Sequence, residues 1–367
     1  MKTSPLPTDA AAAVFRAVNA PLTIERFPIP ALRGNETLVK IRCATICGSD
    51  LHSYQGRRHS PIPCILGHEM VGEVVAMGAD GASDFRGNPL QEGDRVTWSM
   101  VWSCGECFYC RRGLRPKCER LMKFGHEELT PERALTGGLA EYCRLPEKTA
   151  IFKVPPNVSD SVASPSNCAT ATVAAVFRNA GSVADRSVLV HGAGMLGQTA
   201  CAMAACGSAK HVIVLEPDAR RREKALEFGA TETLDSTQSH DRLQARVLEL
   251  TEGRGADLGV ELSGVPEAIE LGIGMLRFGG RFVLAGSVFP SRPVRLLAEQ
   301  VLRRMLQIIG VYNYNPEDLD TALQFLSKVQ ARYPFEQLVG KTFSLSDVNA
   351  AFDFAERQRP PRVAVVP

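Results

Sequence analysis

The first half of the chain carries short stretches in which apolar and polar residues alternate. Residues 11–163 contain runs such as Thr37–Cys43 and Met70–Met77, and Gly, Pro and Asp residues separate these runs. Alternation with a period of two places apolar side chains on one face of a β-strand, and the separating residues are typical of turns. The pattern therefore predicts a β-rich domain.

The pattern changes from about Ser164 onward, where apolar runs alternate with helix-like segments. The apolar runs are Ser187–His191, His211–Glu216, Asp257–Leu262, Gly280–Ala285 and Arg304–Tyr312. Nearly continuous apolar strands that are joined by helices are typical of a parallel sheet covered on both faces. We therefore expect a doubly wound α/β domain in this part of the chain.

The C-terminal tail is expected to return to the β-rich domain. It contains a predicted helix, Pro316–Val329, and a last apolar strand, Arg362–Val366, which we expect to pair with the N-terminal strands. Residues 1–163 and 313–367 are thus predicted to form one domain, and residues 164–312 the other.

Composition and charge narrow the possible functions. The chain has 367 residues, of which 45% are apolar and 22% charged, so it can bury a large core. Its formal net charge of +2 gives no general attraction to nucleic acids or membranes, and neither a targeting segment nor a membrane span is expected. A cytoplasmic location follows, in which the eleven cysteines indicate metal sites or core packing rather than disulfides.

A glycine motif follows the first strand of the α/β domain. It comprises Gly192, Gly194, Met195, Leu196 and Gly197. Such glycines permit a tight turn and a close approach of a pyrophosphate to a helix N-terminus, which predicts a Rossmann dinucleotide site. Glu216 ends the next strand and can bind ribose hydroxyls, which favours NAD over NADP. Arg221, with its two basic neighbours, could instead neutralise a ribose phosphate or lie on the solvated first turn of a helix near Pro217.

Four cysteines close together predict a structural zinc site. They are Cys104, Cys107, Cys110 and Cys118, within an expected lobe of residues 98–120. Four thiolates suit tetrahedral Zn²⁺ and leave no open position for a substrate. The spacing differs from that of bacterial ferredoxins, which argues against an iron–sulfur cluster.

Three further residues are candidates for an open, catalytic zinc site: Cys47, His68 and Cys168. Their segments, the four-cysteine lobe, the glycine motif and two shorter stretches, Gly93–Val96 and Gly137–Tyr142, resemble the zinc-dependent medium-chain alcohol dehydrogenase family. The resemblance spans nearly the whole chain. It implies a GroES-like catalytic domain, made from both chain ends, into which the Rossmann domain is inserted.

The resemblance also implies roles for individual residues. Cys47, His68 and Cys168 would bind a catalytic Zn²⁺ whose fourth position accepts water or substrate oxygen. Ser49 and His52 would pass the alcohol proton to solvent. Glu69 would tune the ligands, and a site completed by Glu69 and water instead of Cys168 is the alternative.

The implied activity is hydride transfer between an alcohol or carbonyl compound and NAD, with two zinc ions per chain in a homodimer or homotetramer. Arg57 and Arg58 form the basic cluster closest in sequence to the catalytic zinc, and His126 lies in a segment that could reach the site. The arginines fit a solvated surface turn best, and His126 fits an exposed loop as well as it fits a site. The functional alternative is that these residues bind an anionic substrate group such as a phosphonate, phosphate or carboxylate, since this segment resembles dehydrogenases of phosphonate catabolism.

Two other functions are open at this point. A zinc-independent quinone or enoyl reductase of the same superfamily would not need Cys47, His68 and Cys168 together. A zinc-stabilised scaffold that docks nucleic acid or protein would use the basic residues of the four-cysteine lobe, but that lobe has no second zinc finger and no aromatic stacking surface.

Overall fold

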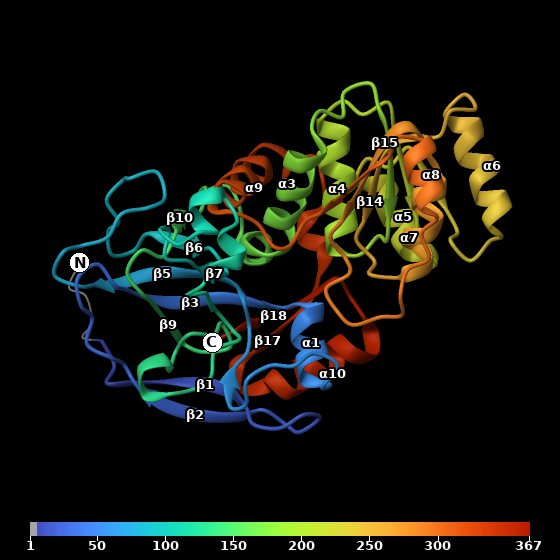
Figure 1. The fold of residues 1–367 in the computed structure, drawn as a ribbon. Coiled ribbons are helices and arrows are strands. Elements are labelled where there is room, and N and C mark those ends of the chain that lie inside the picture. Colours follow the sequence, from blue (N-terminus) through green and yellow to red (C-terminus); the bar gives the residue numbers. More distant parts are fainter. Residues whose placement is uncertain (1–5) are drawn as a thin grey trace. The chain divides into compact units, whose positions relative to one another are not determined.

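The computed structural model describes residues 6–367, and this part of the chain divides into two compact units (Figure 1). The first unit contains the described residues up to Cys168, together with Asn315–Gln330 and Phe335–Pro367. The second contains Ala169–Tyr314 and Ala331–Pro334. The first unit is rich in β-strands and the second alternates strands with helices, as the sequence predicts.

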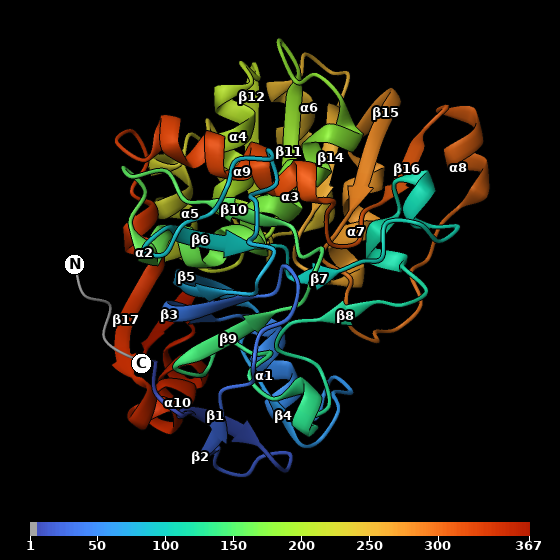
Figure 2. The same cartoon turned by 90° about the vertical axis from the view of Figure 1, so that its left-hand side faces the viewer.

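The largest sheet of the first unit is built from both ends of the chain. Its order is β10 (Ile151–Lys153), β6 (Arg95–Trp98), β5 (Glu69–Met77), β3 (Thr37–Ile46), β18 (Arg362–Val366) and β17 (Val339–Ser344), with β9 (Tyr142–Leu145) paired to β3. Figure 2 shows β6, β5 and β3 side by side. The terminal strand β18 runs antiparallel to β3, which confirms the predicted return of the tail.

Alternation along β3 explains why this segment forms a strand. Val39, Ile41 and Cys43 are buried on one face, whereas Lys40 and Arg42, which lie between them, are exposed on the other. The buried side contributes to a core whose largest side chain is Trp98. Two smaller sheets complete the unit: β2 (Thr23–Pro28), β1 (Asp9–Phe15) and β4 (Cys64–Ile65); and β7 (Val101–Trp102) with β8 (Met122–Lys123).

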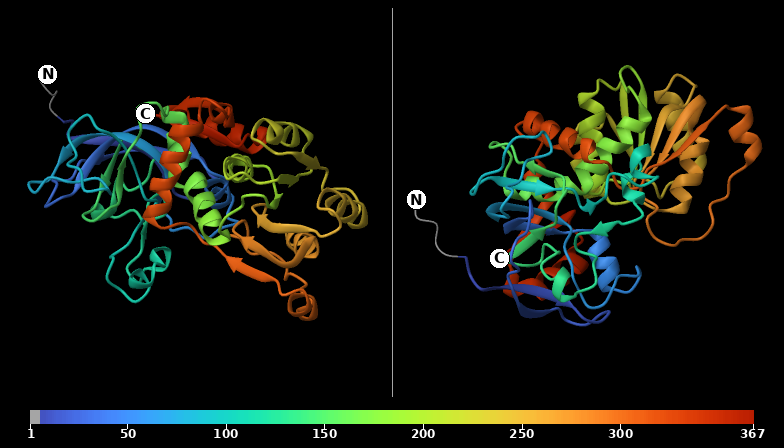
Figure 3. Two further views of the ribbon diagram at one scale, coloured as in Figure 1. Left: turned by 90° about the horizontal axis from the view of Figure 1, so that it is seen from above. Right: turned by 60° about the vertical axis from the view of Figure 1, so that its left-hand side comes forward.

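The second unit has a fully parallel sheet. Its order is β13 (Glu232–Leu234), β12 (His211–Leu215), β11 (Ser187–His191), β14 (Ala256–Glu261), β15 (Leu276–Leu284) and β16 (Gln307–Gly310). Helices cover both of its faces (Figures 1 and 3). They are α3 (Ala169–Ala180), α4 (Met195–Cys206) and α5 (Ala219–Glu227) on one face, and α6 (His240–Leu250) and α7 (Pro266–Gly274) on the other. This arrangement confirms the doubly wound fold.

One predicted strand is shorter than expected. The run Arg304–Tyr312 contributes only β16, because Arg304 caps the C-terminus of α8 (Ala298–Arg303) and Met305 then adopts a positive φ of 53°. The left-handed turn at Met305 delays the start of the strand. By contrast, Ser187–His191, Pro316–Val329 and Arg362–Val366 match their predictions.

The remaining helices belong to the first unit: α1 (Gly48–Tyr54), α2 (Asp160–Ala163), α9 (Pro316–Val329) and α10 (Val348–Gln358). The 3-10 turns are η1 (Cys110–Arg112), η2 (Arg115–Lys117), η3 (Pro131–Arg133), η4 (Ser164–Asn167), η5 (Phe335–Leu338) and η6 (Leu345–Asp347). The turn η4 contacts β3 and β5, so the chain leaves the first unit at Cys168 rather than at Ser164. Among helices of residues 6–367, none is long and apolar enough to cross a membrane.

Candidate functional site

The glycine motif forms the turn between β11 and α4. Gly192 has a φ of +91°, which side chains rarely allow, and a Cβ on Gly197 would lie 1.9 Å from the carbonyl oxygen of Gly192. A Cβ on Gly194 would meet nothing within 4 Å. Gly192 and Gly197 must therefore be glycine for this turn to form, whereas Gly194 leaves open space at the start of α4. Met195 and Leu196 form the first turn of α4, where amide groups can bind an anion.

Glu216 lies beside this turn and is 4% exposed. Its carboxylate accepts hydrogen bonds from the backbone N–H groups of Ala193, at 2.6 Å, and Asp218, at 3.1 Å. Gly192, Gly194, Glu216 and Arg221 line a cavity of about 430 Å³. A carboxylate and open glycine backbone in one cavity fit a dinucleotide, and the structure brings the predicted residues together there.

The four cysteines of the predicted lobe converge on one point. Their sulfur atoms all lie within 4.8 Å of one another, and the distances include 3.5 Å between Cys104 and Cys118 and 4.0 Å between Cys107 and Cys118. A tetrahedral zinc with Zn–S bonds of about 2.3 Å has sulfur–sulfur edges of about 3.8 Å. The donor set therefore fits Zn²⁺. Cys118 Sγ also accepts the backbone N–H groups of Cys104 and Arg120 at 3.3 and 3.4 Å, which suits a thiolate.

A second cluster unites residues that are far apart in the sequence. Ligand atoms of Cys47, His68, Glu69 and Cys168 lie within 4.8 Å of one another. The first three side chains are buried and that of Cys168 is partly buried. Two thiols and an imidazole in one place fit zinc, and both candidates for the third position, Cys168 and Glu69, are present.

Local structure positions each member of this cluster. Cys47 immediately precedes α1, and its backbone N–H donates to the Asp50 carboxylate at 2.9 Å. Gly67 has a φ of +90° and turns the chain into His68, just before β5. Cys168 ends the turn η4. A helix start, a glycine turn and a 3-10 turn thus present the three side chains.

Asp50 orients the imidazole of the cluster. Its Oδ1 lies 3.2 Å from His68 Nδ1, which leaves Nε2 as the nitrogen available to a metal. Burial alone would lower the pKa of His68, but Asp50 raises it to about 9. Ser49 Oγ lies 3.3 Å from His68 Nε2, and His52 follows Ser49 by nearly one turn of α1.

Glu69 and Arg362 form a fully buried ion pair. Arg362 Nε and Nη2 each lie 2.6 Å from a different oxygen of Glu69, and Thr45 donates to the same carboxylate at 2.6 Å. Arg362 Nη2 also lies 3.4 Å from Cys47 Sγ. A hydrogen bond from Cys168 lowers the pKa of Cys47 well below its usual range, and the charge of Arg362 adds to this shift. The thiolate form of Cys47 is therefore favoured.

Comparisons with known proteins identify the family of the chain. Models of the alcohol dehydrogenase GroES-like domain and of the zinc-binding dehydrogenase match residues 33–156 and 196–328. L-threonine 3-dehydrogenase from Alteromonas mediterranea is 34% identical over 333 residues, which cover 89% of this chain and 90% of the relative. 5-exo-hydroxycamphor dehydrogenase from Pseudomonas putida is 28% identical over 324 residues, which cover 87% and 88%.

A solved alcohol dehydrogenase from Thermotoga maritima superposes with a TM-score of 0.92 at 28% identity, and covers 98% of this chain and 99% of its own. The chain belongs to the zinc-dependent medium-chain alcohol dehydrogenase family. The enzyme is therefore an NAD(P)-linked oxidoreductase that acts on CH–OH groups, with zinc and a nicotinamide dinucleotide as cofactors.

Not every predicted residue of this dehydrogenase reaches the metal cluster. Arg57 is exposed on the loop after α1. Arg58 is partly buried instead, and its Nη1 lies 3.4 Å from Nε2 of the buried His126. The His126 ring centroid lies 5.1 Å from that of His68. The structure thus brings Arg58 and His126, but not Arg57, to the cluster.

Two basic residues near the cluster escaped the sequence analysis. Arg362 is the one charged residue in the apolar strand β18, and a single charge in a buried strand indicates a buried ion pair, so the sequence did contain a sign of its role. Lys123 lies in β8, and nothing in its sequence context distinguishes it from a surface lysine. Burial and the charge of Arg58 lower the pKa of Lys123 to about 8, whereas the Cys168 thiol acts in the opposite direction.

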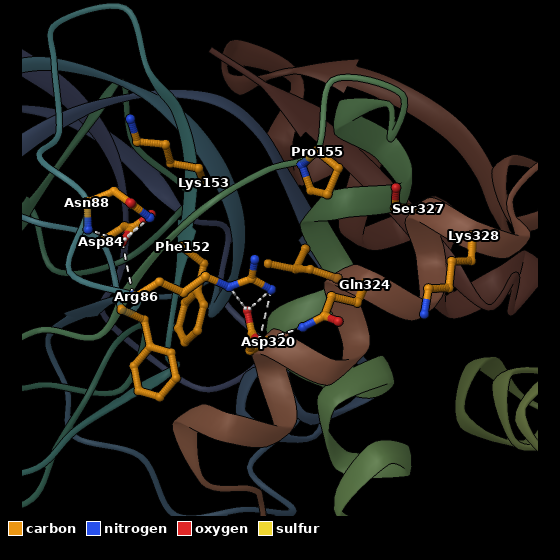
Figure 4. Close-up of a pocket in the computed structure, with 12 residues that line it drawn as sticks. Asp84, Arg86, Asn88, Phe152, Lys153, Pro155, Asp320, Gln324, Ser327 and Lys328 are labelled. Atoms are coloured by element: carbon orange, nitrogen blue, oxygen red, sulfur yellow. Dashed lines mark hydrogen bonds and ion pairs between the residues drawn. The ribbon is translucent and has the colours of Figure 1, made fainter.

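Another cavity, of about 380 Å³, lies in the first unit between the segment around Arg86 and helix α9 (Figure 4). Several of its polar groups already bind each other: Arg86 Nε lies 2.9 Å from Asp320, and Asp84 accepts hydrogen bonds from Asn88. None of the predicted metal ligands or cofactor residues lines it. We therefore assign no role in the reaction to this cavity.

Proposed function

We propose that the dehydrogenase reacts at the cluster of Cys47, His68 and Cys168, with these three residues holding a catalytic zinc. The convergence of two thiols and an imidazole from three separate segments carries this proposal. When bound there, Zn²⁺ acts as a Lewis acid that polarises the oxygen of the substrate. The four-cysteine lobe would hold a second zinc whose role is structural.

Hydrogen bonding supports Cys168, rather than Glu69, as the third ligand. Both carboxylate oxygens of Glu69 already accept short bonds from Arg362, and one also accepts from Thr45. A move of Glu69 to the metal would break these bonds inside the core. We therefore assign to Glu69 the role of holding Arg362 against the Cys47 thiolate.

Ser49 and His52 are proposed to carry the alcohol proton. Ser49 Oγ lies next to His68 Nε2, so a substrate hydroxyl near the cluster would be within its reach. His52 is partly exposed on the same helix and could pass the proton to solvent. Burial, followed by the charge of Arg57, lowers the pKa of His52 and keeps its imidazole available as a base.

NAD is the proposed cofactor. The nicotinamide of a bound dinucleotide supplies the hydride acceptor, and Glu216 would bind the ribose hydroxyls with its remaining acceptor sites. A phosphate at that position would face the buried carboxylate of Glu216, which disfavours NADP. Arg221 lines the same cavity and would interact with the adenosine end.

A homodimer is proposed from the edge of the parallel sheet. Strand β16 ends the sheet order, and its Ile308 side chain is 36% exposed. Leu302 and Met305 nearby are each 76% exposed, which is unusual for large apolar side chains. Pairing of β16 with a second copy would cover both the strand edge and these residues.

The predicted cytoplasmic location stays a prediction.

The test combines zinc content with turnover. Zinc per chain is measured for the wild type, Cys47→Ser and Cys104→Ser, together with NADH formation from secondary alcohols. We expect two zinc ions in the wild type and one in Cys47→Ser, which should lose activity and keep its circular dichroism spectrum. A wild type with one zinc, unchanged in Cys47→Ser, and with no NAD-linked turnover would refute the proposal.

A further inference from the structure

Three basic side chains gather beside the proposed catalytic cluster, and they come from two segments. Arg58 follows helix α1, whereas Lys123 ends β8 and His126 follows it by three residues. Arg58 Nη1 contacts His126 Nε2 at 3.4 Å, and the ring of His126 packs against that of His68 with centroids 5.1 Å apart. The backbone N–H of His126 donates to the carbonyl oxygen of Lys123 at 3.0 Å, so one tight turn holds these two residues together, and burial, with the charge of Arg58, lowers the pKa of Lys123.

The hydrogen bonding of His126 leaves a donor without a partner. A guanidinium group only donates, so His126 Nε2 must accept from Arg58 and the ring proton must reside on Nδ1. Within residues 6–367, His126 Nδ1 has no hydrogen-bond partner, although the residue is only 7% exposed. A buried N–H group without an acceptor is costly and is typical of a site that receives one from a ligand.

Charges around the cluster do not balance without a further anion. The carboxylate of Asp50 is bonded to Cys47 N–H and His68, and that of Glu69 is paired with Arg362. Neither Arg58 nor Lys123 forms an ion pair with a carboxylate in the described part of the chain. Two thiolates already neutralise a bound Zn²⁺. A bound Zn²⁺ leaves His68 neutral, so the carboxylate of Asp50 offsets one of the two cations and a net positive charge remains, partly buried, beside the proposed zinc site.

We propose that the alcohol substrate carries an oxyanion group, a carboxylate or a phosphonate, that binds to Arg58, Lys123 and His126. This inference rests on the proposed function, because it takes the Cys47–His68–Cys168 cluster as the place where the hydroxyl oxygen binds. A guanidinium group can bind two oxygens of either anion at once, an ammonium group adds a third contact, and His126 Nδ1–H donates a fourth.

The same charges discriminate against substrates that carry an ammonium group. L-threonine has an ammonium on the carbon between its hydroxyl-bearing carbon and its carboxylate. Such a cation would lie close to Arg58 and Lys123, and like charges in a partly buried site repel strongly. The enzyme should therefore prefer hydroxy acids or hydroxyphosphonates without an ammonium group, in contrast to the L-threonine 3-dehydrogenases that it resembles.

The test compares kcat/KM for four secondary alcohols: 2-butanol, 3-hydroxybutyrate, 2-hydroxypropylphosphonate and L-threonine. For the better of the two ammonium-free anions, we expect kcat/KM to exceed the values for 2-butanol and L-threonine by about 100-fold. The anion with the higher kcat/KM shows whether the site prefers a carboxylate or a phosphonate. Arg58→Met and Lys123→Met should each lower the ratio of anionic to neutral kcat/KM by at least about tenfold. Arg58→Lys should retain part of this ratio, and Arg357→Met, on the exposed face of α10, should match the wild type.

The outcomes separate this inference from the proposed function. Equal kcat/KM for 2-butanol and both anions, with a ratio unchanged in Arg58→Met and Lys123→Met, would overturn the oxyanion site while the dehydrogenase activity stands. A preference for L-threonine would overturn it as well. Absence of turnover with every alcohol, together with zinc content unaffected by Cys47→Ser, would instead remove the proposed function itself.

Discussion

Replacement of Arg362 by methionine tests how the buried ion pair supports the first unit. The guanidinium group makes two contacts of 2.6 Å with Glu69 and one of 2.7 Å with the carbonyl oxygen of Pro361. Methionine fills a similar volume but offers no charge. Glu69, which is fully buried, would then keep only the Thr45 hydroxyl as a polar partner.

The expected loss follows from the stranded carboxylate. Breaking a buried ion pair by removing one partner costs about 3–5 kcal/mol, most of which reflects the desolvated charge that remains. The double variant Arg362→Met with Glu69→Gln removes that charge, so it should be less destabilised than the sum of the single variants by at least about 2 kcal/mol. Arg357→Met serves as a control because its partner Asp353 is 4.0 Å away and both are well exposed, and it should change stability by less than about 0.5 kcal/mol.

Denaturant unfolding followed by tryptophan fluorescence measures this effect in the relevant unit. Both tryptophans of the chain, Trp98 and Trp102, lie in the first unit, so their emission reports its unfolding. The zinc-saturated proteins should be compared at equal m-values. Additive losses in the double variant, or a loss below about 1 kcal/mol in Arg362→Met, would show that the buried pair does not act as described.

Three further predictions concern other positions. Gly197→Ala should destabilise the second unit by about 1–3 kcal/mol, whereas Gly194→Ala should fold normally and lose roughly tenfold in NAD affinity, as measured by calorimetry. Burial lowers the pKa of His191 from 6.5 to about 4, so the unfolded state binds a proton at a higher pH than the folded state does. The free energy of unfolding should therefore fall as the pH drops from 6.5 to 4, by about 3 kcal/mol in total. His191→Leu should remove this pH dependence in thermal melts, and an unchanged dependence would contradict the prediction. Asp50→Asn should weaken zinc binding about 10- to 100-fold in competition with a chelator, because Asp50 orients His68.

Features that are encoded locally could be predicted from the sequence. The strand Ser187–His191 has the apolar pattern that fits a buried parallel strand, and the glycine motif follows at once. The four cysteines of the lobe lie within fifteen residues, so a short loop suffices to bring them together. In such segments the spacing of the residues along the chain is enough to determine which side chains lie close together.

Contacts that depend on the register of distant strands, or on the path of a loop, could not be predicted. Glu69 and Arg362 are 293 positions apart, and only the pairing of β18 with β3 makes them neighbours. Arg58 and His126 meet only because the loop after α1 and the turn after β8 lie together, and neither segment has a hydrophobic period that predicts this contact. The arginine pair 57–58 shows the same limit, because the direction of each side chain depends on the loop and not on its composition.

The register of the terminal strand links the fold to the chemistry of the catalytic cluster. Val363 pairs with Ile46, next to Cys47, and β5 brings Glu69 opposite Thr45 on the other side of β3. Successive side chains of a strand point to opposite faces, so a slip of β18 by one residue would turn Arg362 away from Glu69 and expose it on the wrong face. The slip would leave both Glu69 and the Cys47 thiolate without their cation. The charge balance at Cys47 therefore depends on the pairing of the C-terminal strand with β3.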